Sequence, residues 1–551
     1  MRSRSGGLCA ALGADFPNRR TCLDSGTSAS SREPRPEGQV RPGGLTLALE
    51  LGLLVRLSFV AAADFPLNDG GLFVSMARQI RLAGGALPWT VPYNGEPIPF
   101  VYPPLPFYLA ALVAGDSVAA LLAFERWFPL AVSMLTIVAF WLLARELLRS
   151  RTASDLATIT FAILPLSYLW VIMGGGITRA PGLLFAILAS WQAYRMFTST
   201  DRQSPWLTAI LSALTLLCHP EAALFVVLTI AVFWAVLGLH RSGTIKVALV
   251  AAGTAVLSAP WWLVAIIRHG VAVLLPVGEP GFGRLGVLLN PFFLGLTSDA
   301  RFPALALMVL LGLAYVLSKR QYLLPLWAGV DYVLMARAPG QKALIPLALM
   351  AGLGARYVLL PLLQQRESAA AQGDRVRGSV NLATVFLGVL VVQTVALDVL
   401  SYRPLLSPLP LAERQAMAWA QANTPQGSRF VVVTGEGGWP QDRSSEWFPT
   451  LSERISVATV QGGEWLDDLN GRIEAYKRLQ ECAGEDGDCL GRWSASYDRP
   501  FDYIYVVKRP PVVSSAALNV DACAGLRSEL RHDPSYEVVY EGEGALIARP
   551  R

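Results

Sequence analysis

Long apolar segments recur along most of this chain, and they constrain its fold more than any other feature. A helix needs about 20 mostly apolar residues to cross a bilayer. The segments that reach or approach this length are 44–63, 126–147, 155–173, 180–197, 206–219, 221–239, 245–267, 302–318, 321–336, 342–363 and 380–400. Hydrophobic residues make up 53% of the sequence and charged residues 16%, and the mean hydropathy is +0.42. The sequence therefore predicts a polytopic α-helical membrane protein with about eleven transmembrane helices.

Composition divides the chain into three parts. Residues 1–43 are rich in Arg, Ser, Gly and Pro without an apolar run, which predicts a disordered segment. Residues 44–400 form the predicted membrane domain. Residues 1–400 together carry a net charge of +10, whereas residues 401–551 carry −5. The last part has the charge density of a water-soluble domain. The excess positive charge lies in loops, so it does not indicate a nucleic-acid-binding protein.

The basic residues also predict the orientation. Arginines and lysines gather in cytoplasmic loops, and an odd number of spans places the two ends of the membrane domain on opposite sides. The loops that we expect in the cytoplasm contain Arg145, Arg149, Arg151, Arg195, Arg202, Arg241, Lys246, Lys319, Arg320, Arg366, Arg375 and Arg377. We expect a multi-pass protein of the plasma (inner) membrane with a cytoplasmic N-terminus and an extracytoplasmic C-terminal domain.

The first outer loop, about 64–125, is unusually long, and long loops often carry function. Apolar residues at helical spacing predict an amphipathic helix over 71–83 that lies on the membrane surface. The apolar stretch 103–125 is expected to be a juxtamembrane or re-entrant helix of the same loop. Asp69 precedes the 71–83 helix. It is either an ordinary N-cap or a catalytic carboxylate at the membrane boundary, whereas Asp64 is more simply a solvated acid.

Two outer turns between spans contain further candidates. In "GGGITRAPG", the glycines permit close backbone approach and Arg179 offers a fork suited to a phosphate. The alternative is a flexible hairpin with an arginine that reaches the interface. In "HPEAALF", His219 and Glu221 either bind substrate hydroxyls, a cation or a sugar, or cap a helix. One His and one Glu fall short of a metal signature.

Outer-side cations complete the set of candidates. Arg337 and Lys342 are placed to neutralise an anionic lipid headgroup, although each is also compatible with a plain surface charge. The C-terminal domain has strand-like and helix-like segments typical of an α/β fold. Its Cys482 and Cys489 bracket an acidic loop, and an oxidising compartment would favour a disulfide between them. We predict no metal-ligand set.

The order of motifs in 56–108 resembles that of the GT-C superfamily of polyprenyl-phosphate-sugar-dependent glycosyltransferases. Its bacterial members include protein O-mannosyltransferase-like enzymes, lipid A aminoarabinose transferases and rhizobial lipopolysaccharide glycosyltransferases. The matching segments are a span, "NDGGLFVSMA" and "YNGEPIPFVYPPLPFYL". The usual family form has a second acid beside the first and a Lys before "PPL". Here Gly70 follows Asp69, and Tyr102 precedes the prolines.

The resemblance implies chemistry at the outer face of the membrane. Asp69 would act as general base on an acceptor hydroxyl of a protein, lipid or cell-envelope glycan, and a polyprenyl phosphate would leave with inversion. Asp64, Tyr102, Arg179, His219, Glu221, Arg337 and Lys342 would bind substrate. No cofactor is expected beyond the lipid-linked donor, although a divalent cation stays open. A lipid-linked oligosaccharide ligase or polymerase, or a non-catalytic binding or sensor protein, is the alternative.

Overall fold

The structure is a computed structural model. It describes residues 43–199, 204–274, 304–335, 339–363 and 401–551, apart from 486 and 510–520, together with short pieces of 388–400. Residues 1–42 of the predicted disordered segment and most of the predicted span 380–400 lie outside these residues.

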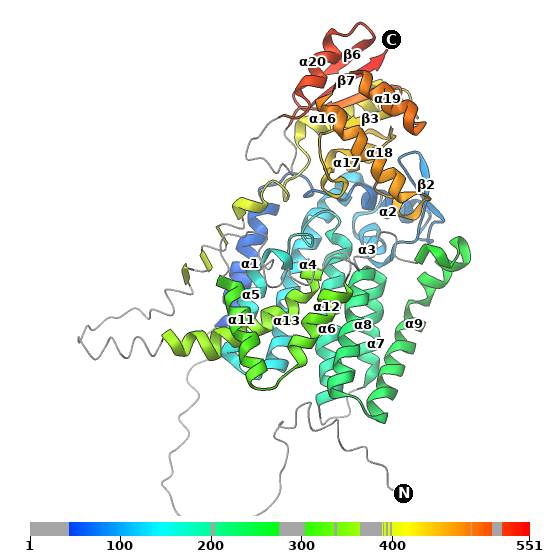
Figure 1. Ribbon diagram of the computed structural model, residues 1–551. Helices are drawn as coiled ribbons and strands as arrows, with labels where there is room; N and C mark the ends of the chain where they lie inside the picture. The colour runs from blue at the N-terminus through cyan, green and yellow to red at the C-terminus, as the bar shows by residue number, and fades with distance from the viewer. Residues whose placement is uncertain are drawn as a thin grey trace, which may run out of the picture.

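A bundle of apolar helices forms the larger part of the molecule (Figure 1). Its helices are α1 (Gly44–Val60), α4 (Val118–Leu148), α5 (Arg151–Ile163), α6 (Gly176–Thr198), α7 (Pro205–Cys218), α8 (Pro220–Leu237), α9 (Arg241–His269), α11 (Ala304–Ser318), α12 (Leu323–Leu334) and α13 (Pro339–Gly354). A π turn, Ala355–Leu359, continues α13, and 3-10 turns occupy Pro165–Ser167 and Val271–Leu274. Within the described residues, four helices are long and apolar enough to cross a membrane, namely Val118–Leu148, Pro220–Leu237, Arg241–His269 and Gln341–Leu363.

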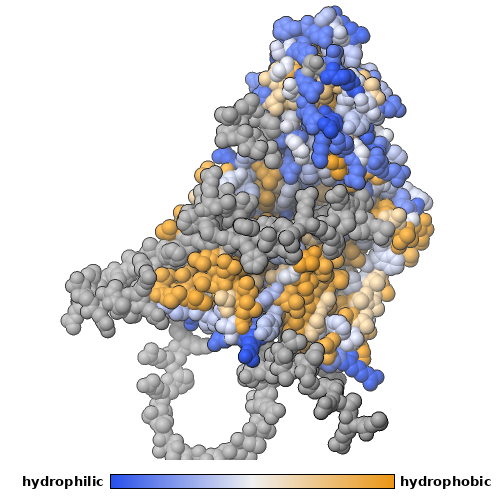
Figure 2. All heavy atoms as spheres, in the orientation of Figure 1, coloured by the Kyte–Doolittle hydropathy of each residue, from blue (hydrophilic) through white to orange (hydrophobic). Residues whose placement is uncertain are grey.

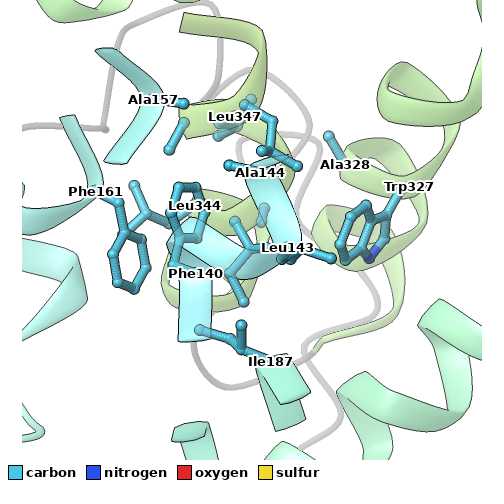
Figure 3. Close-up of a cluster of buried hydrophobic side chains, with 14 of the residues drawn as sticks. Phe140, Leu143, Ala144, Ala157, Phe161, Ile187, Trp327, Ala328, Leu344 and Leu347 are labelled. Atoms are coloured by element: carbon cyan, nitrogen blue, oxygen red, sulfur yellow. The ribbon is translucent and has the colours of Figure 1, made fainter. Parts of the chain in front are cut away.

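Aromatic and aliphatic side chains from several helices meet in the centre of the bundle (Figure 3). Phe140 of α4 stacks on Phe161 of α5 with ring centroids 4.3 Å apart. Trp327 of α12 is fully buried, and its indole N–H donates to Thr229 Oγ1 at 2.9 Å. A buried indole N–H requires such a partner, so this contact sets where α12 lies against α8.

Two predicted boundaries were wrong. The 155–173 span ends as a helix at Ile163, because Leu164 is extended and Pro165 starts a 3-10 turn. Helix α4 begins at Val118, where the Ser117 side chain accepts from the Ala120 N–H, rather than at 126. Residues up to 125 were expected to belong to a separate helix of the first outer loop, but Glu125 is buried within α4.

The remainder of the predicted first outer loop lies between the bundle and the C-terminal domain (Figure 1). It contains α2 (Gly71–Leu82), the antiparallel pair β1 (Thr90–Tyr93) and β2 (Glu96–Pro99), and α3 (Leu105–Ala114). The predicted helix over 71–83 is confirmed. Its apolar face, however, packs against α3 and the C-terminal segment α17 (Arg443–Ser452) rather than standing free for lipid.

The C-terminal residues form a five-stranded sheet with helices around it. The strand order is β4-β3-β5-β7-β6, with β3 parallel to β4 and β5 and with β7 antiparallel to β5 and β6. The strands are β3 (Arg429–Val433), β4 (Ile455–Ser456), β5 (Tyr503–Val507), β6 (Tyr536–Glu541) and β7 (Ala545–Pro550). Besides α17, the helices are α16 (Leu411–Asn423), α18 (Leu469–Glu481), α19 (Gly487–Tyr497) and α20 (Ala524–His532), with 3-10 turns at Trp439–Gln441, Gly463–Trp465 and Cys482–Gly484.

The surface of the molecule separates into two regions. In Figure 2, hydrophobic residues gather over the helix bundle and hydrophilic residues over the C-terminal domain. A disulfide joins Cys482 to Cys489 at the junction of α18 and α19. Of the other cysteines, Cys218 and Cys523 are buried free thiols in the described part of the chain.

Candidate active site

The turn that carries Asp69 has an uncommon backbone. Asn68 is left-handed with φ 55°, and Gly70 has φ 136°, a value that residues with a side chain rarely adopt. The C-terminal domain holds both ends of this turn. The Trp447 indole donates to the Asn68 carbonyl at 2.7 Å, and the Gly70 N–H donates to Glu446 Oε1 at 2.9 Å. Asp69 is therefore fixed between two residues that are themselves anchored.

The Asp69 carboxylate faces the beginning of α6. Its Oδ1 accepts from the Gly175 N–H at 2.8 Å, and its Oδ2 lies 2.8 Å from Arg179 Nη2. The side chain is 8% exposed. The interpretation of Asp69 as N-cap of the following helix was wrong, since Gly70 occupies that position and no side chain caps α2. The carboxylate instead pairs with a cation and a helix N-terminus from elsewhere in the chain.

The glycine-rich segment before α6 allows this contact. A Cβ on Gly174 would lie 1.8 Å from the Asp69 carbonyl oxygen, and one on Gly175 would lie 2.7 Å from Asp69 Oδ2. The Gly174 N–H also donates to the Leu67 carbonyl at 2.9 Å. The glycines permit close backbone approach, as the sequence indicated, but the segment is the ordered start of α6 rather than a flexible hairpin.

Two further carboxyl groups that the sequence analysis did not single out surround Gly70. Glu125 of α4 and Glu446 of α17 are both buried, and a Cβ on Gly70 would lie 2.4 Å from Glu125 Oε2. There is therefore no room here for the second acid that the usual family motif places beside the first. Among the described residues, neither oxygen of Glu125 has a hydrogen-bond partner. Glu446 lies within "EWFPTL". Its position on a helix is the only feature of that segment that could have indicated a role in the site.

Burial and charge shift the pKa of Glu446. Removal from water raises this pKa to about 8, and the charge of Asp69 adds to the rise, while the Gly70 N–H and Arg179 act in the opposite direction. A carboxyl group with this pKa holds its proton at neutral pH. Glu446 is then neutral at pH 7, and Asp69 is the acid of the two that has a salt bridge to Arg179.

Tyr102 lies beside the same arginine. Its hydroxyl is 3.4 Å from Thr178 Oγ1 on α6. Burial raises the pKa of the phenol to about 12, with Arg179 opposing the rise and Glu221 contributing to it. Tyr102 is thus a neutral hydrogen-bonding group at physiological pH. The structure brings this predicted residue together with Asp69 and Arg179.

The "HPEAALF" turn contributes one structural residue and one charge near the site. The His219 ring accepts from the Ala222 N–H at 3.4 Å and caps α8. The carboxylate of Glu221 lies within electrostatic range of Tyr102. His219 therefore has the helix-capping role that the sequence left as one alternative.

Lys342 belongs to the same charged region. It is buried at the start of the Gln341–Leu363 helix, within electrostatic range of Glu221 and Arg179. Asp331 of α12 also acts on this lysine. Neither oxygen of Asp331 has a hydrogen-bond partner in the part of the chain that the structure describes. Arg179 and Lys342 therefore supply positive charge between the Asp69 turn and the bundle.

Two predicted residues do not join this group. Asp64 is 60% exposed and forms an ion pair with Arg414 of α16, so it is a surface acid that connects the loop to the C-terminal domain. Arg337 lies outside the described residues. No group of three or more His, Cys, Asp or Glu side chains suited to a metal ion occurs in the described ranges.

Comparison with known proteins identifies the fold. No model of a protein family matches the sequence, and no curated protein matches it either. Solved structures do match. The oligosaccharyltransferase of Archaeoglobus fulgidus in complex with Zn and sulfate aligns with a TM-score of 0.56 at 14% identity, over 84% of this chain and 68% of that one.

Two other solved structures agree. The archaeal oligosaccharyltransferase AglB from Archaeoglobus fulgidus, in complex with an inhibitory peptide and a dolichol-phosphate, has a TM-score of 0.52 at 14% identity, over 84% of this chain and 69% of that chain. The arabinofuranosyltransferase AftD from Mycobacteria has a TM-score of 0.52 at 16% identity, over 92% of this chain but 41% of its own. The chain therefore shares the helical fold of these solved structures, as the resemblance drawn from the 56–108 motifs led us to expect.

Proposed function

We propose that this protein is a membrane glycosyltransferase that moves a sugar from a polyprenyl-phosphate donor to a hydroxyl acceptor on the outer face of the membrane. The observation that carries the proposal is the buried Asp69 carboxylate, held 2.8 Å from Arg179 in a chain with the GT-C fold. An ionised carboxylate beside a cation that can bind phosphate supplies the two groups that sugar transfer needs. The acceptor is a protein, a lipid or a cell-envelope glycan.

The reaction is a single displacement at the anomeric carbon. Asp69 takes the proton from the acceptor hydroxyl while the acceptor oxygen forms its bond to that carbon. The bond between the anomeric carbon and the phosphate oxygen breaks, and the phosphate leaves with the electron pair. Attack from the face opposite the phosphate inverts the configuration. A positioned general base of this kind typically contributes about 10²–10⁴-fold in rate.

The leaving phosphate requires positive charge. Arg179 presents a planar fork that matches phosphate oxygens, and the buried Lys342 adds a second basic group within electrostatic range of it. The Tyr102 phenol and Thr178 hydroxyl offer neutral hydrogen bonds at the same place. We infer that these residues hold the phosphate and that Glu221 contacts sugar hydroxyls. The negative charge of the donor phosphate would weaken the ion pair between Arg179 and Asp69.

A second candidate is transfer of a whole lipid-linked oligosaccharide. It is favoured by the likeness in fold to the archaeal oligosaccharyltransferase, which was solved with dolichol-phosphate and an inhibitory peptide. The two candidates share the site and the direction of attack and differ in the size of the group transferred.

Turnover by the purified protein in nanodiscs distinguishes them. We expect release of polyprenyl phosphate and labelling of an acceptor when polyprenyl-phosphate monosaccharides are supplied. Transfer only from a long lipid-linked glycan would assign the second candidate. Tight binding of both donors without transfer of either would contradict the enzyme assignment and favour a binding protein.

We also propose that residues 44–400 are the membrane domain, that 401–551 form an extracytoplasmic α/β domain, and that the protein lies in the plasma membrane with its N-terminus in the cytoplasm. The basic loops support this orientation. The contact of the C-terminal domain with the Asp69 turn requires both to be on the same side.

Reporter fusions test the orientation. A reporter that is active only in the periplasm should be active when fused after Leu400 and inactive when fused after Arg366, because one predicted span separates the two positions. A cytoplasmic reporter at the same positions is the control and should give the opposite pattern. Activity after Arg366 alone would exclude the outer-face site.

A further inference from the structure

The C-terminal domain contributes atoms directly to the turn that carries Asp69. Helix α17 lies across α2 and meets its first residues. Besides the contacts of Glu446 and Trp447 described above, Thr450 Oγ1 donates to the Gly71 carbonyl at 2.8 Å. A Cβ on Gly71 would lie 2.8 Å from the Glu446 carbonyl oxygen, so the two backbones are in close contact.

The same interface extends along the hairpin β1–β2. The Tyr93 hydroxyl donates to the Glu446 carbonyl at 2.6 Å. Asn94 exchanges two hydrogen bonds with the backbone of Ser456, at 2.7 and 2.6 Å. Residues that are more than 350 positions apart therefore share one hydrogen-bonded layer, and within it the Glu446 side chain bonds Gly70, the residue that follows Asp69.

We propose that Glu446, which the C-terminal domain inserts beside Gly70, is a positioning residue for the transfer reaction, and that the active site is complete only while this domain is seated on the first outer loop. This inference rests on the proposed function, because it assigns Glu446 to the site in which Asp69 is the base. Glu446 touches the backbone of the Asp69 turn and acts through that turn rather than on substrate.

The charged groups around Glu446 explain why a carboxyl is suited to this place. Asp69 and Glu464 disfavour its ionised form, and Arg179 favours it. The Tyr93 phenol, buried with a pKa raised above its usual value, is neutral. Glu125 of α4 is the remaining acid within electrostatic range of Asp69 and Glu446.

The expected pH dependence follows from these neighbours. Below pH 8 a protonated Glu446 accepts the Gly70 N–H without competing with Asp69 for Arg179. As the pH rises through the pKa of about 8, ionised Glu446 places a second negative charge beside Asp69 and draws on the same arginine. Wild-type kcat/KM should therefore fall above about pH 8.

Three variants of the full-length protein test the proposal. Glu446→Gln keeps an oxygen acceptor for Gly70 and cannot ionise, so it should retain the rate at pH 7 and lose the decline near pH 8. Glu446→Ala removes the acceptor, and displacement of the turn by about 1 Å should lower kcat roughly 100-fold with little change in KM. Glu453→Gln is the matched control, because Glu453 follows α17 and pairs with Arg78 of α2 across the same interface, but it is 56% exposed.

Hydrogen exchange supplies a readout that needs no turnover. The amides of residues 68–72 should exchange about tenfold faster in Glu446→Ala than in the wild type, and at the wild-type rate in Glu453→Gln. An unchanged decline near pH 8 in Glu446→Gln, or wild-type kcat in Glu446→Ala, would overturn the positioning role. If Glu446→Ala does not fold, the pH profile of Glu446→Gln decides whether Glu446 has the positioning role.

The two proposals fail in different ways. If the wild type transfers sugar from no donor, the proposed function is rejected. Hydrogen exchange of the amides of residues 68–72 would then still test whether Glu446 holds the turn. Normal wild-type transfer with unchanged exchange and pH profile in the Glu446 variants would reject the positioning role alone.

Discussion

Asp69→Asn should lower kcat for sugar transfer by roughly 10²–10⁴-fold, the range that a positioned general base contributes. Asparagine has the same shape and keeps an oxygen to accept the Gly175 N–H, which Asp69 Oδ1 accepts at 2.8 Å. It cannot take a proton from the acceptor hydroxyl. Donor binding should be retained or tightened, since Arg179 loses its 2.8 Å partner and is then free for phosphate. The measurement is single-turnover transfer from a labelled donor, with donor affinity determined separately.

Asp64→Asn is the matched control for that experiment. It makes the same chemical change in the same loop, five positions earlier in the sequence, but Asp64 is largely exposed and pairs with Arg414. Exposed ion pairs contribute about 0–1 kcal/mol to stability, so we expect near wild-type kcat. Retained turnover in Asp69→Asn, or an equal loss in both variants, would place the base elsewhere.

Gly174→Ala should abolish most of the activity without touching any side chain of the site. Its Cβ would lie 1.8 Å from the Asp69 carbonyl oxygen, so the two backbones must separate by more than about 1 Å to reach a tolerable contact. A displacement of that size costs on the order of 100-fold in rate when it misplaces a catalytic group. Overpacking should also lower the free energy of unfolding by about 1–3 kcal/mol. Transfer rate and thermal midpoint measure the two effects.

Gly329→Ala serves as the control for Gly174→Ala. Gly329 lies within α12, and a Cβ there would meet nothing within 4 Å. Alanine favours a helix interior over glycine by about 1 kcal/mol, so this variant should be as stable as the wild type or more so, with unchanged transfer. Wild-type activity in Gly174→Ala would show that the Asp69 turn does not need its present distance from α6.

Several features of this protein could be predicted because they depend on neighbouring residues. Apolar runs of nearly 20 residues predicted most of the bundle helices, and helical spacing within 71–83 predicted α2. The alternation of strand-like and helix-like segments likewise indicated the elements now seen as β3, β5 and α16. Asp69 and Arg179 were singled out because each is an ionisable residue in a turn between apolar segments, and the structure places them in contact.

Other predictions failed where local pattern and tertiary contact disagree. The stretch 103–125 was expected to be a juxtamembrane or re-entrant helix of the first outer loop. In the structure it divides between α3 and the first turns of α4. Glu125 of α4 lies beside Gly70, and Arg126 donates to the Val60 carbonyl. Similarly, Asp69 was considered as the cap of the nearest helix, whereas it meets α6, more than 100 positions later.

The sequence by itself thus predicted a helical membrane protein that resembles the GT-C type, with an acid in the loop after its first apolar segment. Only the tertiary structure decided which groups surround that acid. Glu446 reaches Gly70 across 376 positions, and no periodicity or composition of either segment specifies that contact. It exists because the indole of Trp447 is buried against Phe65 and bonds the Asn68 carbonyl, which carries the neighbouring carboxyl group of Glu446 to the side of Asp69.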